Sequence, residues 1–350
     1  MVEIEKYTIS YKATIKDALI KINDLTNRKT LVLFVLNNEN KIIGSLTDGD
    51  VRRGFLKGVG LNDSVQIVMN KNYQYINDNS SIDELKRLKE EKLKIVPLLD
   101  DNKNIIKFIN FMNIKTILPL DVVIMAGGKG IRLKPYTDDI PKPLLKLDKK
   151  PIIVHNIDRL LTFGVNSFYI SVNHMKNKII KYLDNEYKDK DISISYLEEL
   201  QPLGTIGSLS LVKNYKNFDI LVINSDLLTN IDFEDFYTTY KKHNDDMSIA
   251  SFNTKIDIPY AVMQTTDKKI DSFIEKPTYR YYSNAGIYLI KKEYVCLIPE
   301  NQKYDAIDFM NLLIKEGKRV THFPIRGYWL DIGTPENYSK AQDDIRYIQF

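Results

Sequence analysis

Residues 122–137 read VVIMAGGKGIRLKPYT, and residues 141–145 continue with PKPLL. The apolar run 122–126 predicts a buried strand. The glycines directly after this run let backbone N–H groups approach a chain of phosphates. Lys129, Arg132 and Lys142 add positive charge to the same loop. The segment therefore predicts a strand that leads into a polyphosphate-binding loop.

This loop differs from two other phosphate-binding motifs. No Gly-Lys-Ser or Gly-Lys-Thr occurs in it, so it is not a Walker loop. The dinucleotide fingerprint is also excluded, because Leu133 stands where a third small residue must pack. Cations follow where a ribose-binding carboxylate would be expected, which again excludes a dinucleotide site.

From Asp121 onward, apolar runs that predict strands alternate with helical patterns. Ile153, Ile157 and Leu160 have the spacing of one helix face, and Pro151 stands just before them. Such alternation predicts an α/β domain with a Rossmann-like, mostly parallel mixed sheet, covered on both faces, that binds ligands at the carboxyl ends of its strands. The expected strands are 122–126, 168–172, 192–196, 220–223, 248–252 and 286–290.

Residues 1–118 contain an approximate internal repeat. Helical patterns begin at Thr14 and at Ser81. Two short strands separated by a polar turn follow each of them. These strands are 31–36 and 42–44 in the first copy, and 95–99 and 105–106 in the second. The repeat predicts an N-terminal α/β domain, residues 1–118, ahead of a catalytic domain, residues 119–350.

Composition excludes several classes of protein. The 350 residues are 43% hydrophobic and 27% charged, which excludes a disordered chain, collagen and a coiled coil. With 50 Lys and Arg against 46 Asp and Glu, no nucleic-acid partner is expected. The single cysteine, Cys296, the short apolar runs and the lack of a leader at Met1 predict a cytoplasmic protein with no membrane partner.

The string AGGxGxRLxPxT followed by PKPLL resembles the sugar-1-phosphate nucleotidyltransferases, and every fixed position of it is present in residues 126–145. Further landmarks follow in the order of that family. They are PLGTIG at 202–207, NSD at 224–226, FIEKP at 273–277, NAGIY at 284–288 and WLDIGTP at 329–335. Lys146 departs from the pattern, since proline is common there, but it lies beyond the functional residues. The resemblance covers residues 121–345 and implies the nucleotide-diphospho-sugar transferase fold.

The resemblance also implies roles for individual residues. Asp226 and Asp331 would hold Mg²⁺, and their oxygen ligands favour magnesium over zinc. Arg132 would bind the departing pyrophosphate, while Lys142 and Lys276 would bind the phosphates of the two substrates. The catalytic set is thus Arg132, Lys142, Asp226 and Asp331. The nucleotide would contact Ala126, Gly127, Gly128, Lys129, Gly130, Glu199, Gly204 and Thr205, and the sugar phosphate Tyr260, Glu275, Lys276, Asn284 and Gly286.

The reaction expected is attack of an ionised sugar 1-phosphate on the α-phosphate of a nucleoside triphosphate, which needs alignment and charge neutralisation rather than a general base. Glu199 precedes Pro202 by three residues, and its carboxylate can accept two hydrogen bonds from guanine, which favours GTP. Uridylyl, cytidylyl and thymidylyl transfer are alternatives. An inactive nucleotide-sensing scaffold is the alternative outside enzymes.

The repeat in residues 1–118 resembles a tandem pair of cystathionine-β-synthase-type (CBS) domains. This resemblance implies an adenine nucleotide as a second ligand, or a dimer formed through these domains. Gly44, Thr47 and Asp50 match the family's ligand-binding GxxTxxD, with Thr near phosphate and Asp on the ribose. The alternative is that Thr47 and Asp50 only cap a helix at Val51. The corresponding residues of the second copy are Lys107, Asn110 and Asn113, so at most one intact site is expected.

A paired CBS module joined to such an enzyme resembles the guanylyltransferases of bacterial legionaminic acid pathways. These act on glucosamine 1-phosphate, so this sugar is favoured. Mannose 1-phosphate and a manno-heptose 1-phosphate are the alternatives.

Overall fold

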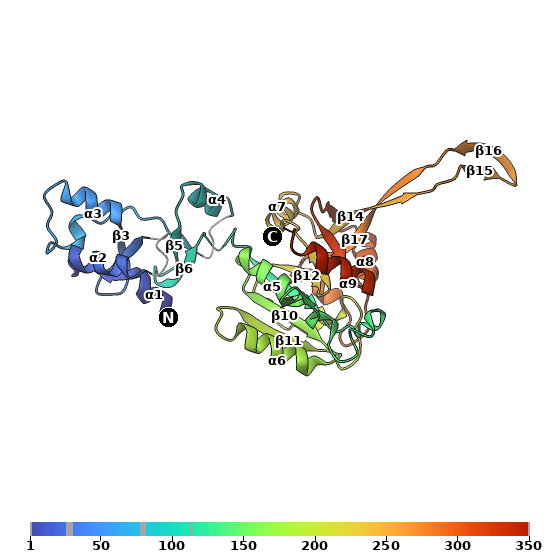
Figure 1. Ribbon diagram of the computed structural model, residues 1–350, viewed down its shortest axis with the longest axis horizontal. Helices are drawn as coiled ribbons and strands as arrows, with labels where there is room; N and C mark the ends of the chain where they lie inside the picture. The colour runs from blue at the N-terminus through green and yellow to red at the C-terminus, as the bar shows by residue number, and fades with distance from the viewer. Residues whose placement is uncertain (1, 26–30, 78–81, 113, 349–350) are drawn as a thin grey trace. The chain divides into compact units, whose positions relative to one another are not determined.

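The computed structural model describes residues 2–25, 31–77, 82–112 and 114–348 (Figure 1). The chain divides into two compact units, Met1–Ile117 and Leu118–Phe350. Each unit has its own sheets and its own hydrophobic core. In the described residues, no helix combines the length and the apolar character needed to cross a bilayer.

Unit 1 contains two three-stranded sheets of the same topology. In both sheets the first two strands pair in parallel and the last two pair antiparallel. Both middle strands also carry an irregularity near their ends, at Val35/Leu36 and at Leu98/Leu99. The structure thus repeats as the sequence does, although the expected helix start at Ser81 and the site residue Asn113 lie outside the described residues. The elements are α1 (Val2–Tyr7), β1 (Thr8–Ser10), α2 (Ile15–Asn23), β2 (Val32–Leu36), β3 (Ile42–Thr47), α3 (Asp48–Phe55), η1 (Val65–Ile67), β4 (Ile76–Asn77), α4 (Ile82–Glu90), β5 (Ile95–Leu99) and β6 (Ile105–Asn110).

A shared core joins the two halves of unit 1. The rings of Phe34 on β2 and Phe108 on β6 stack with their centroids 5.0 Å apart. Tyr7 packs edge-on against Phe108, at 5.7 Å. These aromatic residues are buried with Ile42 and Ile95, one from each sheet. The two halves are therefore one folded body.

Unit 2 is built on a seven-stranded sheet with the order β11-β10-β7-β12-β17-β14-β18. Four of its six strand pairs are parallel, and β17 runs against both of its neighbours. The predicted mostly parallel mixed sheet is confirmed. The strands are β7 (Leu120–Met125), β10 (Ser167–Val172), β11 (Ser193–Glu198), β12 (Asp219–Asn224), β14 (Met247–Asp257), β17 (Thr278–Lys291) and β18 (Val320–Pro324).

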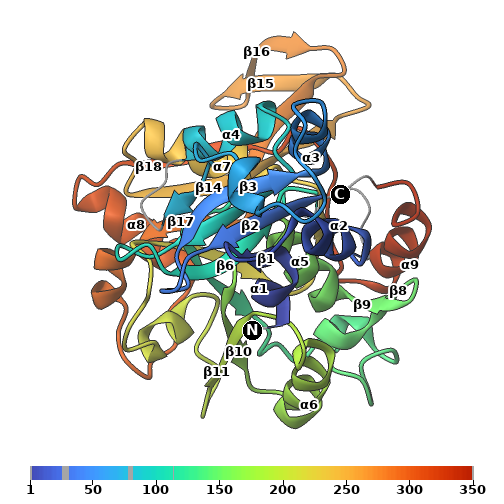
Figure 2. The same ribbon diagram turned by 90° about the vertical axis from the view of Figure 1, so that its left-hand side faces the viewer.

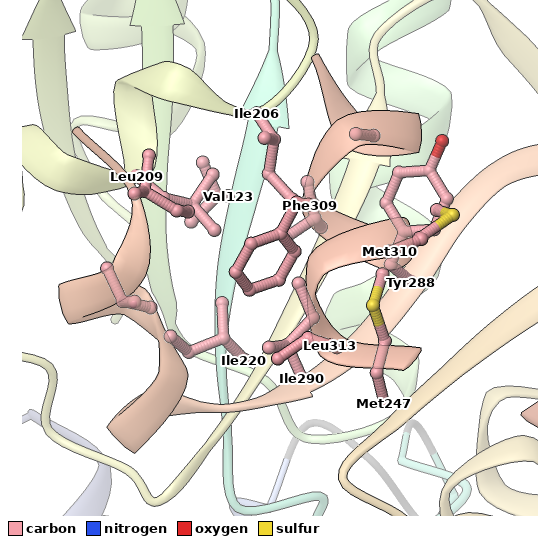
Figure 3. Packing of buried hydrophobic residues seen from close by; sticks show 14 of the residues in the cluster. Val123, Ile206, Leu209, Ile220, Met247, Tyr288, Ile290, Phe309, Met310 and Leu313 are labelled. Carbon is pink, nitrogen blue, oxygen red and sulfur yellow. The ribbon is translucent and has the colours of Figure 1, made fainter. Parts of the chain in front are cut away.

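Both faces of this sheet are buried, because successive side chains of its central strands point to opposite faces. Ile220 and Val222 of β12 pack in the cluster that contains Phe309 of α8, whereas Leu221 and Ile223 are buried on the other face. Figure 3 shows the Phe309 ring beside Ile220 and Ile290. The helices are α5 (Ile152–Thr162), α6 (Lys176–Tyr187), α7 (Phe233–Lys242), α8 (Ala306–Lys315) and α9 (Pro335–Asp344).

Unit 2 also contains shorter elements. Two of them, β13 (Leu227–Thr229) and β19 (Trp329–Asp331), pair antiparallel with one another. The others are η2 (Ile131–Leu133), η3 (Lys142–Leu144), β8 (Lys146–Leu147), β9 (Lys150–Pro151), η4 (Gly207–Leu211) and η5 (Lys292–Leu297).

A long ribbon extends beyond the sheet, as Figures 1 and 2 show for β15 (Val262–Thr266) and β16 (Lys269–Ile274). Strands β14 and β17 stay paired from Ser251↔Asn284 to Asp257↔Thr278. Their outer neighbours stop earlier, since β12 pairs with β17 only as far as Ile287 and β18 with β14 only as far as Ser251. Residues 252–283, hereafter the arm, thus form a two-stranded ribbon.

Candidate active site

A cavity of about 310 Å³ lies at the carboxyl edge of the sheet. It forms where β7 and β12 end, because parallel neighbours present their carboxyl ends at the same edge. Its floor and walls come from the loop after β7, the turn after β12 and the segment after β19. The lining residues are Met125, Gly128, Lys129, Gly130, Ile131, Arg132, Lys142, Pro143, Ser225, Asp226 and Gly333.

The two predicted metal ligands, Asp226 and Asp331, lie side by side although they are far apart in sequence. Antiparallel pairing of β13 with β19 sets Leu227 opposite Asp331. The backbone N–H of Ile332 donates to the carbonyl oxygen of Asp226 at 3.0 Å. Asn337 at the start of α9 donates to the carbonyl oxygen of Asp331 at 2.8 Å. Backbone bonding therefore fixes the two carboxylates relative to one another.

Lys142, at the start of η3, balances part of the charge of this pair. Its Nζ donates to Asp226 Oδ2 and lies 3.9 Å from Asp331 Oδ1. Burial, and then the negative charge of Asp226, raise the pKa of Asp331, while the charges of Lys142 and Arg132 partly oppose this rise. Lys142 thus contacts both carboxylates, and Arg132 acts on Asp331 through its charge.

The site fits a magnesium ion by its donor atoms. Asp226 Oδ1 is buried and has no hydrogen-bond partner among the described residues. A buried carboxylate oxygen without a donor is costly unless a ligand completes it. No cluster of three or more His, Cys, Asp or Glu side chains suited to a metal occurs in the described ranges. Two carboxylates suffice for Mg²⁺, however, because this ion commonly takes its other ligands from water and substrate phosphates.

The expected nucleotide-binding loop follows β7 directly. The backbone N–H of Ala126 donates to Ser171 on β10 at 2.9 Å, and this bond fixes the start of the loop. Gly128, Lys129 and Gly130 then line the cavity. A Cβ atom added to Gly128 would meet no atom within 4 Å. The protein's own packing therefore leaves room for a side chain at Gly128, and the glycine leaves space for a ligand instead.

Glu199 lies beneath this loop and is buried. A Cβ added to Gly127 would lie 3.1 Å from its Oε1 atom. The hydroxyl of Ser171 donates to Oε1, and the backbone N–H of Leu203 donates to Oε2 at 2.9 Å. Each carboxylate oxygen keeps a further lone pair. Glu199 therefore holds the loop at Leu203 as well as bordering the expected base pocket.

The structure gives Gly204 and Thr205 contacts of their own with the start of α8. Gly204 has a φ of +81°, and a Cβ there would lie 2.6 Å from the carbonyl oxygen of Tyr304. The hydroxyl of Thr205 accepts the backbone N–H of Ala306 at 2.8 Å, so it serves as a cap for α8. Their contact with a nucleotide stays a prediction.

The expected sugar-phosphate residues fall into two groups. Gly286 lies beside the end of β12, because a Cβ on Gly286 would be 2.5 Å from the side-chain amide of Asn224. Asn284 is next to it and accepts the backbone N–H of Gly286 at 2.8 Å. Tyr260, Glu275 and Lys276, in contrast, are exposed residues of the arm. No arm residue is among the described residues that line the cavity.

Among the described residues that line the cavity, five were not among the site residues expected from the sequence, namely Met125, Ile131, Pro143, Ser225 and Gly333. Gly333 packs against both Asp331 and Arg132, since a Cβ there would lie 3.0 and 3.1 Å from their side chains. It belongs to the WLDIGTP landmark, which was the available signal. Asp305 accepts the backbone N–H of Thr205 at 3.2 Å and thereby holds the PLGT turn. No motif singled it out.

Unit 1 has a separate cavity of about 480 Å³ that Thr47 and Asp50 line with Arg53, Lys92 and Lys94. Thr47 and Asp50 also form a capping box at the start of α3, which begins at Asp48 rather than at Val51. Thr14 and Asp17 form the same capping box at the start of α2, outside this cavity. Helix capping alone therefore explains the Thr-x-x-Asp spacing. Thr47 and Asp50 differ from Thr14 and Asp17 in that they line the cavity.

Residues 121–347 match the family described as nucleotidyl transferase. The chain belongs to this family. It is 31% identical over 226 residues to the mannose-1-phosphate guanyltransferase of Saccharomyces cerevisiae, an alignment that spans 62% of this chain and 62% of the yeast protein. The crystal structure of HddC from Yersinia pseudotuberculosis is also similar, with 28% identity, a TM-score of 0.51, and coverage of 65% of this chain and 99% of HddC.

HddC has also been crystallised with GMP-PN, and that structure is 28% identical with a TM-score of 0.50. It covers 65% of this chain and 99% of its own. The nucleotidyl transferase family accounts for unit 2, and the matched region begins three residues after unit 2 does.

Gly128 is expected to make room for a ligand, whereas Gly204 is required by the packing of the fold. We expect Gly128→Ala to leave the free energy of unfolding within about 0.5 kcal/mol of wild type. We expect it to raise the KM for the nucleoside triphosphate by about tenfold, since a methyl group keeps phosphate oxygens from the backbone N–H groups. Gly204→Ala should instead destabilise the protein by more than about 1 kcal/mol. Urea unfolding and steady-state kinetics measure both effects, and an unchanged KM in Gly128→Ala contradicts the phosphate assignment.

Proposed function

We propose that this nucleotidyl transferase joins GTP to a sugar 1-phosphate and releases pyrophosphate. The observation that carries the proposal is the cavity that places Lys129, Arg132 and Lys142 around two adjacent carboxylates. Cations beside a carboxylate pair suit the transfer of a phosphoryl group with a divalent metal. The guanyltransferase relative and the GMP-PN complex of HddC support guanine as the base. Uridylyl, cytidylyl or thymidylyl transfer are the alternatives that the experiments below distinguish.

The acceptor sugar has two supported candidates. Glucosamine 1-phosphate is favoured by the resemblance to guanylyltransferases that carry a paired CBS module. Mannose 1-phosphate is favoured by the name of the yeast relative. A manno-heptose 1-phosphate is the third candidate.

In the proposed reaction a phosphate oxygen of the sugar 1-phosphate attacks the α-phosphorus of GTP. The bond from that phosphorus to the bridging oxygen breaks, and pyrophosphate leaves with the electron pair. Lys129 and Arg132 neutralise charge on the phosphates, and Lys142 is placed to exchange Asp226 for a phosphate oxygen. Asp226 and Asp331 would hold Mg²⁺, which polarises the α-phosphate when bound. No side chain has to remove a proton, because the attacking phosphate is already ionised.

For unit 1 we propose an adenine nucleotide as ligand, bound in the cavity that Thr47 and Asp50 line. Lys92, Lys94 and Arg53, which pairs with Asp50, supply positive charge to this cavity, and Leu31 and Tyr73 supply apolar surface for a base. Phosphate groups and an aromatic base together match this lining. Unit 1 would then act as a regulatory or dimerising domain.

Removal of either metal-binding carboxylate should abolish turnover. We expect Asp226→Ala and Asp331→Ala each to lower kcat by about a thousandfold or more, since charge on the α-phosphate is no longer neutralised. Asp138→Ala is the matched control, because Asp138 is a half-exposed carboxylate that pairs with Lys134 outside the cavity. Pyrophosphate release in the presence of Mg²⁺ measures the activity. Full turnover in both site variants would contradict the metal assignment.

Base specificity should depend on Glu199. We expect GTP to give the highest kcat/KM in a matrix of five triphosphates against hexosamine, hexose and heptose 1-phosphates. Glu199→Gln should lower kcat/KM for GTP by about tenfold to a hundredfold more than for UTP. The reason is that the N1–H and N2–H₂ groups of guanine lose the carboxylate that accepts from both.

Glu198→Gln is the control for this substitution, because the neighbouring Glu198 is exposed and pairs with Lys176 at 2.5 Å. Equal losses for GTP and UTP in Glu199→Gln would show that Glu199 only supports the loop. No turnover with any pair of substrates would contradict the enzyme function and favour the scaffold.

Nucleotide binding to unit 1 should be sensitive to Asp50 and insensitive to Asp17. Asp50→Asn keeps an oxygen for the helix cap but removes the charge that would accept from ribose hydroxyls, so we expect about tenfold weaker binding of adenine nucleotides. Asp17→Asn makes the same change in the equivalent cap of α2 and should bind as the wild type does. Calorimetry with AMP, ADP and ATP measures both, and no heat with any of them would leave dimerisation as the role of unit 1.

A further inference from the structure

We propose that the arm completes the active site of a second copy of this chain, so that Glu275 and Lys276 bind the sugar phosphate held in the partner's cavity. This inference rests on the proposed function and on the assignment of Glu275 and Lys276 to the sugar phosphate. It goes beyond that assignment, because it says which chain supplies the two residues.

The first observation is that Lys276 cannot reach the cavity of its own chain. Gly286 packs against Asn224 at the end of β12, and the ladder from Ser251↔Asn284 to Asp257↔Thr278 leads away from that end. At about 3.3 Å per residue, the eight residues between Asn284 and Lys276 span roughly 26 Å. This is several times the length of a lysine side chain. To fold back, the arm would have to break the paired ladder of β14 and β17.

The second observation is that the arm exposes apolar side chains on both of its faces. Met263 is paired with Phe273 across the ribbon, and Val262 with Ile274 in the adjacent pair, whose side chains point to the opposite face. Met263 is 57% exposed and Phe273 is 62% exposed. An isolated two-stranded ribbon is marginal in water, and it becomes stable when its faces are covered. The arm therefore has the composition of a segment that packs between other surfaces.

The third observation is where Glu275 and Lys276 lie along the arm. The two ladders of the ribbon, β14 with β17 and β15 with β16, are interrupted between Ile258 and Val262 on one side and between Ile274 and Thr278 on the other. Lys276 has a φ of +43° in this interruption, which strains a residue with a side chain. Glu275 and Lys276, an exposed acid and an exposed cation, therefore lie between two paired ladders at a fixed place along the arm.

The fourth observation is a group of exposed apolar side chains, hereafter the rim, on the segments that form the cavity or adjoin them in sequence. Ile131 borders the cavity and is 65% exposed, and Ile140 precedes the PKPLL segment and is 47% exposed. Leu200, directly after Glu199, is 95% exposed. These side chains belong to the loops that also carry Arg132 and Glu199. The rim offers the arm an apolar surface near the phosphate-binding loop. The partner proposed is a second copy of this chain, because that copy presents the same rim together with the sugar phosphate in its cavity.

A two-fold symmetric pair satisfies these observations at once. Each arm would cover the rim of the partner, and each cavity would receive one Glu275 and one Lys276. The exposed tyrosines Tyr281 and Tyr282 near the base of the arm suit such an interface, because tyrosine is enriched where proteins meet. Lys276 would add positive charge opposite Lys129 and Arg132, where the sugar phosphate has to lie.

Complementation between two inactive variants tests this arrangement. Asp226→Ala disables the metal site of its own chain, and Lys276→Gln disables the arm. We co-express the two full-length variants with different affinity tags and purify the mixed pair through both tags. In a swapped pair, one cavity carries both lesions and the other carries neither, so the mixed pair should show about half the activity of wild type. Each variant alone should be inactive.

Each other outcome overturns the inference. A mixed pair without activity, alongside an active wild type, would show that Lys276 serves its own chain. Full activity of Lys276→Gln alone would show that the arm does not bind the sugar phosphate. An inactive wild type would refute the proposed function before any variant is compared, and the inference with it.

A second variant tests the packing of the arm. Phe273→Asp should raise the KM for the sugar 1-phosphate by about tenfold or more, because a charge on the arm weakens its docking. Phe218→Asp is the matched control, since Phe218 is a 78% exposed aromatic residue outside the arm. Equal kinetics in these two variants would overturn the docking.

Discussion

The antiparallel pairing of β13 with β19 is the constraint on which the active site depends. It holds Asp226 beside Asp331 at the carboxyl edge of the sheet, where both are partly withdrawn from water. Burial, and then the repulsion between two negative charges so placed, raise the pKa of Asp331. Lys142 relieves the repulsion by donating to Asp226. This arrangement is consistent with the proposed binding of Mg²⁺ by the two carboxylates and of a phosphate by Lys142.

The surrounding loops are fixed in ways that serve this pair. Gly333 lets Arg132 approach Asp331, Thr205 attaches the PLGT turn to α8, and Glu199 ties that turn to β10. Thr205 and Glu199 each accept a backbone N–H, from Ala306 and Leu203 respectively, so hydrogen bonds within the protein hold these loops. Positioned groups of this kind are what electrostatic stabilisation of a transition state requires in the proposed reaction.

Much of this site could be predicted from the sequence, because its residues follow buried strands directly. Six apolar runs predicted six strands of the sheet, and the order of the motifs predicted the family, which is confirmed. The full length of β14 and β17 could not be predicted, since their outer halves are polar and exposed and have no apolar pattern of their own. Spacing also could not separate Thr47 and Asp50 from Thr14 and Asp17, because a helix cap and a ligand site use the same side chains.

The arm explains why the nucleotide half and the sugar half differ in how well the sequence predicts them. The nucleotide half is built from loops that the sheet itself positions, so the distance from strand to ligand is a few residues. Glu275 and Lys276, proposed for the sugar phosphate, lie on a ribbon that has left the body of the sheet, so their position depends on the direction of that ribbon. In the proposed pair, the surface that covers the apolar faces of the ribbon sets this direction. A partner surface, unlike a strand register, leaves no periodic pattern in the sequence of a single chain.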